Sequence, residues 1–135
     1  MYLLDTDACI RVLNGSSARV IGQLRSHAPA EIRISSVTRA ELLHGARRSA
    51  RVAENLRVLD SFFAPLVSVP FDDVYAEQYA VLRASLAAGG RPIGPNDLLI
   101  AATALAHDLT LVTSHLREFS RVAGLEIEDW ERPAP

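Results

Sequence analysis

The sequence predicts a single α/β domain in which helices flank a mostly parallel central sheet of about five strands. Short apolar runs alternate along the chain with longer segments whose apolar residues recur every three or four positions. This alternation is typical of parallel sheets that are covered on both faces. The 135 residues contain no linker or repeat, and an apolar share of 49% is enough for a real core. We therefore expect one domain over residues 1–135.

Two strands and four helices are expected in the first half of the chain. Residues 2–5 form an apolar run, and residues 31–35 alternate between apolar and polar side chains as a strand does. Asn14-Gly15 favours a helix end, and Ser36 or Thr38 is a candidate helix cap. Apolar spacing predicts the four helices over residues 6–13, 16–27, 36–48 and 50–63.

The second half of the chain predicts three more strands and three more helices. Pro65 breaks the preceding helix, and Gly89-Gly90 ends the following one. We expect strands over residues 66–69, 110–113 and 125–128, and helices over residues 71–88, 96–107 and 116–119. The alanine-rich segment 96–107 is apolar almost all round, which places it in the core.

Three acidic residues adjoin apolar segments where an isolated charge is unfavourable. Asp5 ends the first strand, Glu41 interrupts a helix, and Asp97 opens another helix. An ionised carboxylate beside a core needs a cation or hydrogen-bond donors. Sites in parallel sheets lie at the carboxyl ends of strands, where Asp5 stands. If the three acids converge they repel one another, and a divalent metal is the simplest remedy. The pattern favours a metal-dependent reaction on phosphate.

Each of these acids also has a structural interpretation. Asp5 could simply cap the helix that follows it, and Asn96 or Asp97 could cap the helix that starts beside them. Glu41 could be a solvated helix residue, which is the usual environment of a glutamate.

Other polar residues also have both a functional and a structural interpretation. Asp7 lies in the first turn of a helix, where an acid meets the dipole favourably, and a secondary part at the metal site stays open. Thr113 and Ser114 end a strand, so they could hold a metal-bound water or phosphate, or only satisfy backbone groups. His115 follows them. The arginines between residues 39 and 57 could guide RNA or form a solvated helix face.

Four blocks of the sequence resemble those of PIN-domain ribonucleases of the VapC toxin type, in the same order and over nearly the whole chain. The blocks are Leu4-Asp5-Thr6-Asp7, then Ser35-Ser36-Val37-Thr38-Arg39-Ala40-Glu41-Leu42, then Arg91-Pro92-Ile93-Gly94-Pro95-Asn96-Asp97, and finally Leu111-Val112-Thr113 with Arg117-Glu118-Phe119. The resemblance implies an endoribonuclease that uses Mg²⁺ or Mn²⁺ to hydrolyse RNA phosphodiester bonds. It assigns Asp5, Glu41 and Asp97 to the acidic core as catalytic residues and metal ligands.

His115 is a departure from the family pattern, which usually has Asn or Asp at this position. Carboxylate and carbonyl oxygens suit Mg²⁺, whereas imidazole suits Mn²⁺, Zn²⁺ and later metals better. From the sequence, four consequences stay open: His115 could stand away from the metal, contact phosphate, shift the metal preference or weaken the activity.

The resemblance also implies partners. It implies the toxin of a type II toxin–antitoxin system, a VapB-type antitoxin protein, a homodimer, and operator DNA reached only through the antitoxin. RNA is the substrate, and tRNA is one candidate. No apolar run has the length of a membrane span and no secretion signal is visible, so we expect no membrane association and a cytoplasmic location. The single cysteine, Cys9, agrees with that location.

Two other functions compete with the ribonuclease. A haloacid-dehalogenase-like phosphatase would use Asp5-Thr6-Asp7 as its nucleophile motif, but Cys9 stands where that family has Thr or Val, and the chain contains no lysine. A catalytically disabled PIN-like protein that only binds an antitoxin is the second alternative, and His115 keeps it open. The net charge of −2 does not exclude RNA, because 13 acidic residues face 14 arginines once the three suspected site acids are set aside.

Overall fold

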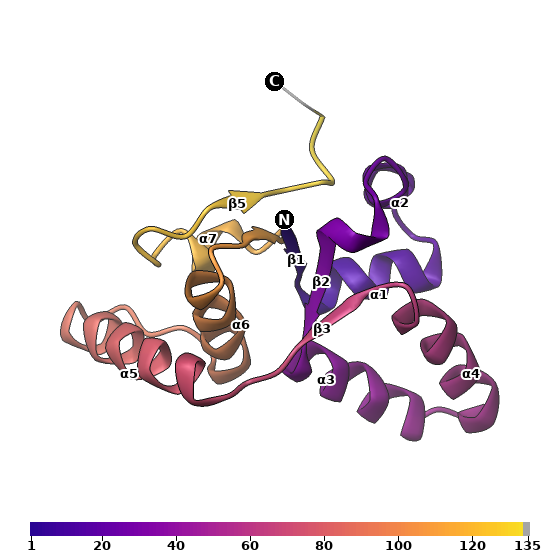
Figure 1. Ribbon diagram of the computed structural model, residues 1–135, viewed down its shortest axis with the longest axis horizontal. Coiled ribbons are helices and arrows are strands. Elements are labelled where there is room, and N and C mark those ends of the chain that lie inside the picture. The colour runs from indigo at the N-terminus through magenta and orange to yellow at the C-terminus, as the bar shows by residue number, and fades with distance from the viewer. Residues whose placement is uncertain (134–135) are drawn as a thin grey trace.

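A five-stranded parallel sheet separates two groups of helices, as Figure 1 shows for the computed structural model, which describes residues 1–133. The strands are β1 (Tyr2–Leu4), β2 (Ile32–Ser35), β3 (Val67–Val69), β4 (Thr110–Val112) and β5 (Ile127–Glu128). The helices are α1 (Thr6–Asn14), α2 (Ala18–Arg25), α3 (Ser36–Arg47), α4 (Val52–Phe63), α5 (Asp73–Ala88), α6 (Pro95–Ala106) and α7 (Leu116–Phe119). The predicted fold class and the order of its elements are confirmed.

The strand order is β3-β2-β1-β4-β5, and every neighbouring pair is parallel. The chain builds outward from β1 to β3, then returns to the other side of β1 with β4. Strand order therefore reverses between β1 and β4, where Leu4 lies opposite Val112. In open α/β sheets, such a reversal leaves a crevice outside the carboxyl ends of the two strands. This topology places a site immediately after Leu4 and Val112.

The two faces of the sheet carry separate hydrophobic cores. Leu4, Ile34 and Val112 pack against α1 to α4 on one face, and Leu3 and Leu111 pack against α5 to α7 on the other. Successive strand residues point to opposite faces, so adjacent apolar residues serve both cores. In Figure 1 the first group of helices lies to the right of the strands and the second to the left. No helix within residues 1–133 is both long and apolar enough to cross a membrane.

The caps of two helices differ from the expected residues, and one short turn was not predicted. Ser35, rather than Ser36 or Thr38, caps α3, because its extended backbone lets Oγ accept the Thr38 N–H at 3.0 Å. Neither Asn96 nor Asp97 caps α6. That helix begins at Pro95, whose ring favours the first helical position and whose missing N–H is not needed there. A short 3₁₀ turn at Pro29–Glu31, which the pattern did not predict, precedes β2.

Helix α6 lies in the core, as predicted, and its small residues allow close packing against α5. Ala101, Ala102 and Ala104 are fully buried. We expect Ala101→Leu to lower the free energy of unfolding by roughly 1–3 kcal/mol, because added methylenes have no space in a packed core. Urea denaturation monitored by circular dichroism measures this change. The matched control is Ala84→Leu at an exposed position of α5, where a shift of comparable size would contradict the packing argument.

Candidate active site

Asp5 lies at the switch point between β1 and β4, directly after Leu4. Its backbone N–H donates to the Val112 carbonyl at 3.0 Å, and its Oδ1 accepts the Ala8 N–H at 2.8 Å. The capping role considered for Asp5 is therefore present. Only 3% of the residue is exposed, which is unusual for a helix cap and leaves a buried carboxylate at the carboxyl edge of the sheet.

Burial raises the pKa of Asp5 to about 6. Hydrogen bonds from the Thr113 hydroxyl and the Ala8 N–H oppose this rise, as does His115, while the charge of Asp7 adds to it. The donors around Asp5 therefore compensate its charge only in part. A further positive charge at this edge would lower the pKa of Asp5 towards its ordinary value.

Asp97 is the third residue of α6 and approaches the same edge of the sheet. Burial raises its pKa above the ordinary value, His115 opposes the rise, and the charges of Glu118 and Asp7 add to it. The charges of Asp7 and His115 thus shift the pKa values of both Asp5 and Asp97.

The loop after β4 contributes the polar residues that the sequence singled out. Thr113 is 1% exposed, and its Oγ1 accepts the His115 backbone N–H at 2.9 Å. His115 pairs through Nε2 with Oδ2 of Asp7. Ser114 lines a small cavity together with Arg11 of α1. His115 therefore contacts Asp7, and both Thr113 and Ser114 border the small cavity beside Arg11.

Glu41 lies in the middle of α3, whereas Asp5 and Asp97 lie at or near the start of a helix. Thr38, one turn earlier, is buried and its Oγ1 accepts the Thr6 hydroxyl at 3.2 Å, so this face of α3 meets the start of α1. Residues three apart share a helix face, and Glu41 accordingly lines a cavity with Ile10 of α1. Among the described residues, the charges that shift the pKa of Asp5 and Asp97 do not include Glu41. Its part in the acidic site stays a prediction.

The carboxylates of Asp5 and Asp97 are of the chemical type that suits a hard divalent cation. Two partly compensated acids with raised pKa values gain most from a nearby positive charge, and oxygen donors are what Mg²⁺ prefers. Within residues 1–133, no three Asp, Glu, His or Cys side chains are grouped closely enough to form a metal cage.

Sequence reasoning missed two features of this site. Glu118 of α7 acts on Asp97, and its only sequence signal is its place in the block Arg117-Glu118-Phe119. The Thr38 hydroxyl also accepts the Ser35 hydroxyl at 3.2 Å, in addition to the contact with Thr6. This hydroxyl cluster joins the loops after β1 and β2, and no pattern of single residues predicts it.

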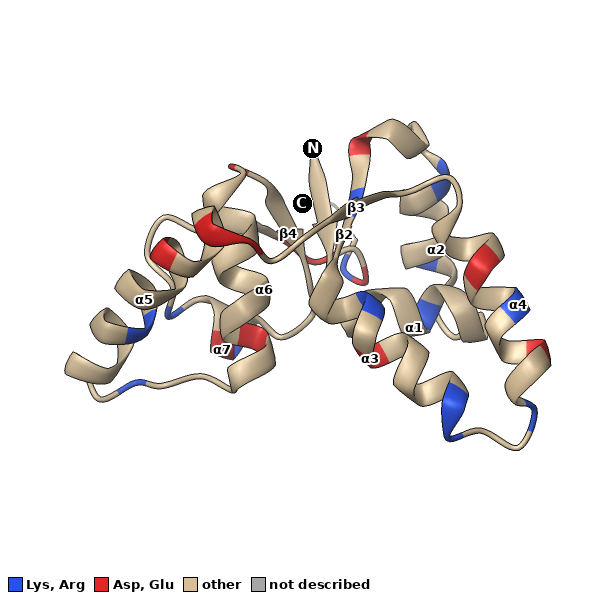
Figure 2. Ribbon diagram, turned by 60° about the horizontal axis from the view of Figure 1, so that its bottom comes forward, with Lys and Arg blue, Asp and Glu red and all other residues tan. Residues whose placement is uncertain are grey.

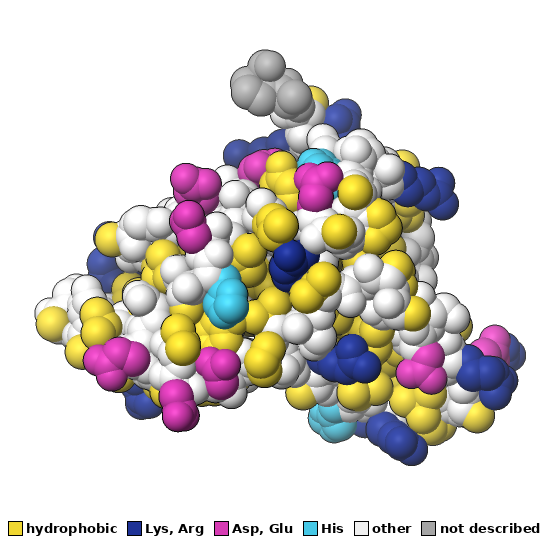
Figure 3. Space-filling model, in the orientation of Figure 1, with side chains coloured by type: hydrophobic (Ala, Val, Ile, Leu, Met, Phe, Trp, Pro, Cys, Tyr) yellow, Lys and Arg dark blue, Asp and Glu magenta, His cyan; other side chains and the backbone are white. Residues whose placement is uncertain are grey.

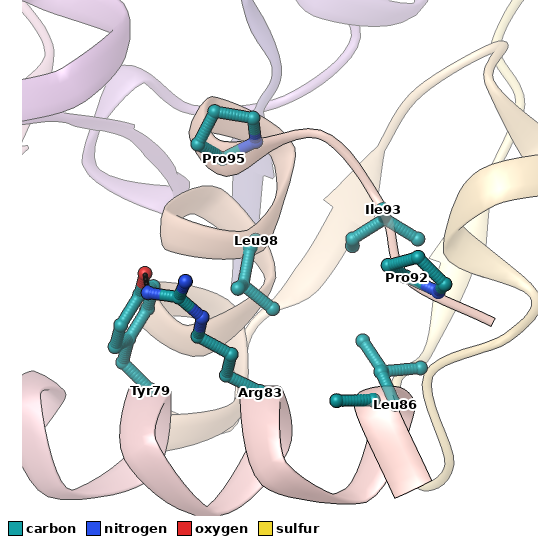
Figure 4. Close-up of a pocket in the computed structure, with 8 residues that line it drawn as sticks. Tyr79, Arg83, Leu86, Pro92, Ile93, Pro95 and Leu98 are labelled. Atoms are coloured by element: carbon teal, nitrogen blue, oxygen red, sulfur yellow. Dashed lines mark hydrogen bonds between the residues drawn. The ribbon is translucent and has the colours of Figure 1, made fainter. Parts of the chain in front are cut away.

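A cavity of about 380 Å³ lies beside the start of α6. Figure 4 shows Tyr79 and Arg83 projecting from α5 below Leu98 of α6, with Ile93 on the opposite side. The Arg83 guanidinium donates to the Tyr79 hydroxyl at 3.0 Å. Leu98, which lines this cavity, directly follows Asp97 in the chain. Its lining is mostly apolar and contains no carboxylate.

Comparisons with known proteins show the family to which the chain belongs. Residues 2–125 match the PIN domain family. The chain is 38% identical over 129 residues to the tRNA(fMet)-specific endonuclease VapC of Shigella flexneri, covering 96% of this chain and 97% of that one. It is 36% identical to a chain in the crystal structure of DNA-bound VapBC from Salmonella typhimurium, with a TM-score of 0.90 over 96% of this chain and 97% of that one. A chain of VapBC2 from Rickettsia felis, bound to a promoter DNA fragment, is also 36% identical, with a TM-score of 0.89 over 96% of this chain and 98% of that one.

These similarities bear directly on the competing functions. The matches extend over almost the full length of both chains, and the relatives are named as endonucleases or ribonucleases. They support a nuclease function for the chain. Neither the phosphatase nor the disabled binding protein gains support from them.

Proposed function

The chain belongs to the VapC ribonucleases of the PIN-domain family, and we propose that it is a metal-dependent endoribonuclease that acts as the toxin of a type II toxin–antitoxin pair. The observation that supports this proposal is that Asp5 follows β1 and Asp97 lies in the first turn of α6, and that burial raises the pKa of both carboxyls while Asp7 and His115 act on both. PIN-domain nucleases in general depend on divalent metal ions, and these two acids offer the oxygen donors that such ions require.

Asp5 and Asp97 would hold Mg²⁺ or Mn²⁺, directly or through water. When bound, such an ion supplies charge neutralisation at the phosphate and a water of lowered pKa. The chain's own contribution is orientation: the Ala8 N–H and the Thr113 hydroxyl fix the Asp5 carboxylate. We assign Glu41 as a further ligand or as the group that orients the attacking water, with Thr113 and Ser114 as accessory contacts to water or phosphate.

RNA is the proposed substrate, and tRNA is the first candidate to test. The relatives from Shigella flexneri and Salmonella typhimurium are named tRNA(fMet)-specific endonucleases. Arg47, Arg48, Arg51 and Arg57 are exposed on α3, α4 and the turn between them, and basic side chains are visible over these helices in Figure 3. Such residues can bind the phosphate backbone of RNA. Arg39 instead packs its guanidinium over the Phe63 ring, 4.3 Å from the ring centre.

We propose a VapB-type antitoxin as the protein partner. Solved relatives are described as VapBC complexes, some bound to DNA. In this chain, a groove of about 300 Å³ between α1, α3 and α4 is lined by Ile10 and Val58, which are 41% and 47% exposed, and by Glu41. An amphipathic segment with a basic residue would complement both the apolar groove and the adjacent acids. We further propose a homodimer, operator DNA bound only through the antitoxin, one domain over residues 1–135, and action in the cytoplasm.

Mapping of cleavage sites on total RNA tests the function. We expect the purified chain to cut at few positions in Mg²⁺ or Mn²⁺, to cut nothing in chelator, and to be silenced by its antitoxin. The control is Asp60→Asn, which removes an exposed acid of α4 away from the site and should preserve the pattern. Cleavage that persists in chelator would contradict metal dependence. A covalent phosphoryl-aspartate on Asp5 would contradict direct hydrolysis.

A further inference from the structure

The loop that leads into α6, residues 91–94, is held by few hydrogen bonds. At one end the Arg91 N–H donates to the Leu86 carbonyl of α5 at 2.9 Å. At the other end the Leu98 N–H donates to the Gly94 carbonyl at 2.9 Å. Figure 2 shows the loop as an extended stretch along the lower edge of the molecule, between the end of α5 and the start of α6. Both bonds lie at these helix ends, so they do not fix the loop against the rest of the fold.

One hydrogen bond joins this loop to a distant part of the chain. The guanidinium of Arg121, which follows α7, donates through Nη1 to the Pro92 carbonyl at 2.9 Å. Among the hydrogen bonds within residues 1–133, no other links the loop to a segment outside α5 and α6. The Ile93 side chain adds packing against the hydrophobic core beneath α5 to α7. One apolar side chain and one donated bond therefore hold the loop in place.

Arg121 is firmly anchored at its own end. Its neighbours Phe119 and Val122 are 0% and 4% exposed, and its backbone N–H donates to the Glu118 carbonyl at 3.2 Å. Its Nε is buried without a hydrogen-bond partner, and no ion pair of the described residues includes this arginine. The bond to Pro92 is thus the polar contact that this guanidinium makes with the described part of the chain.

The position of the loop affects where α6 starts, because no side chain caps that helix. Gly94 is its N-cap residue, Pro95 opens it, and Asp97 is its third residue. A helix moves as a unit, so a shift of the loop at Pro92 is carried to the Asp97 carboxylate. A misplacement of about 1 Å in a reacting group can lower a rate by roughly 100-fold. The bond from Arg121 is therefore in a place where it can control a reaction that it does not touch.

We propose that Arg121 is a positioning residue for RNA cleavage: its bond to the Pro92 carbonyl fixes the start of α6, and with it the place of the Asp97 carboxylate. The inference rests on the proposed function, since it uses the role that Asp97 has there. It adds a residue from the segment after α7, which acts through the loop rather than by contact with RNA.

Loss of this bond should lower the rate of cleavage rather than the affinity for RNA. A hydrogen bond from a charged donor changes an equilibrium by roughly tenfold or more. Without the bond, the loop leaves its position more often, and Asp97 occupies the productive place for a smaller share of the time. A change of this kind lowers kcat and kcat/KM together and leaves KM nearly unchanged. The Pro92 carbonyl needs only one donor, so a lysine at position 121 can replace the arginine.

Steady-state cleavage kinetics test the proposal, with an RNA oligonucleotide that carries the mapped cleavage site and at a temperature where every variant is folded. Arg121→Met keeps most of the apolar stem and removes all donors, and we expect its kcat to fall roughly tenfold at unchanged KM. Arg121→Lys should regain most of the parent kcat. The matched control is Arg19→Met at an exposed position of α2, which removes the same charge and should preserve kcat.

Amide hydrogen exchange tests the same contact without RNA. The Leu98 N–H is protected by its bond to the Gly94 carbonyl, and this bond opens when the loop moves. We expect Leu98 to exchange roughly tenfold faster in Arg121→Met than in the parent. The Leu111 N–H of β4, which donates to the Glu126 carbonyl at 2.9 Å, should exchange at the parent rate.

Each other outcome overturns the inference. A parent kcat in Arg121→Met, with Asp97→Asn inactive, would leave the proposed function intact and remove the arginine from it. A rise in KM alone would make Arg121 an RNA contact. If Arg121→Lys were as slow as Arg121→Met, the donated bond would not be what the reaction needs. Equally faster exchange at Leu98 and Leu111 would make the arginine a general stabiliser. Failure of the proposed function looks different: the parent would cut no RNA, or Asp97→Asn would cut at the parent rate.

Discussion

Replacement of Asp97 by Asn is expected to abolish RNA cleavage while the protein stays folded. The change removes one of the two carboxylates proposed to hold the cation and keeps the shape of the side chain. Loss of groups that only support a metal ligand lowers activity by 10–100-fold, so loss of the ligand itself should lower the rate by on the order of 10³-fold or more. Cleavage of the mapped RNA site at saturating Mg²⁺ measures the effect.

The stability of the same variant gives an independent check. Burial and the charges of Glu118 and Asp7 make the ionised form of Asp97 unfavourable in the fold and raise its pKa. A neutral Asn relieves that repulsion, so the unfolding temperature in chelator should be equal to or higher than that of the parent at neutral pH. Asp60→Asn again serves as the control. A folded Asp97→Asn variant that cuts RNA at the parent rate would remove Asp97 from the proposed site.

The raised pKa of Asp5 should make the stability of the metal-free protein depend on pH. Its folded pKa is raised to about 6 from 3.8. Below pH 3.8 the carboxyl is protonated in both states and contributes nothing. Between about pH 4 and 6 the unfolded chain ionises while the fold keeps its proton, so the folded state loses stability as the pH rises. Above pH 6 the loss is complete, and a shift of this size amounts to about 3 kcal/mol at most.

The measurement compares the parent with Asp5→Asn in chelator, by urea denaturation from pH 4 to pH 7.5. Asn can still accept the Ala8 N–H, so the helix cap is kept. Other titrating groups affect both proteins alike, and the difference between their unfolding free energies isolates Asp5. We expect the variant to gain stability relative to the parent as the pH rises through this window. A difference that is flat with pH would mean that Asp5 is not strained by its burial. Mg²⁺ should restore stability to the parent alone.

Most of the fold was predictable because its signals are local. Turn residues such as Gly15, which adopts a left-handed backbone with φ of 69° at the end of α1, mark element ends wherever they occur. Apolar spacing identified α6 as a core helix, and its buried alanines confirm this. Placement of Asp5 at a strand end followed from the same reasoning. The cap of α3 was misplaced by one residue, because Ser35 and Ser36 are equally good candidates until the backbone angles are known.

The sequence by itself determined the order of strands and helices, the parallel sheet, and the place of Asp5 at a strand end, since these depend on periodicity and on the direction of each element. The tertiary structure alone decided that β4 lies beside β1, that Asp7 meets His115, that Glu118 joins the acids, and that Glu41 faces a groove along α3. The pairing of β4 with β1 and the contact of Asp7 with His115 each join residues more than a hundred positions apart. They are set by which side chains pack between the layers, a choice that no local pattern in the chain encodes.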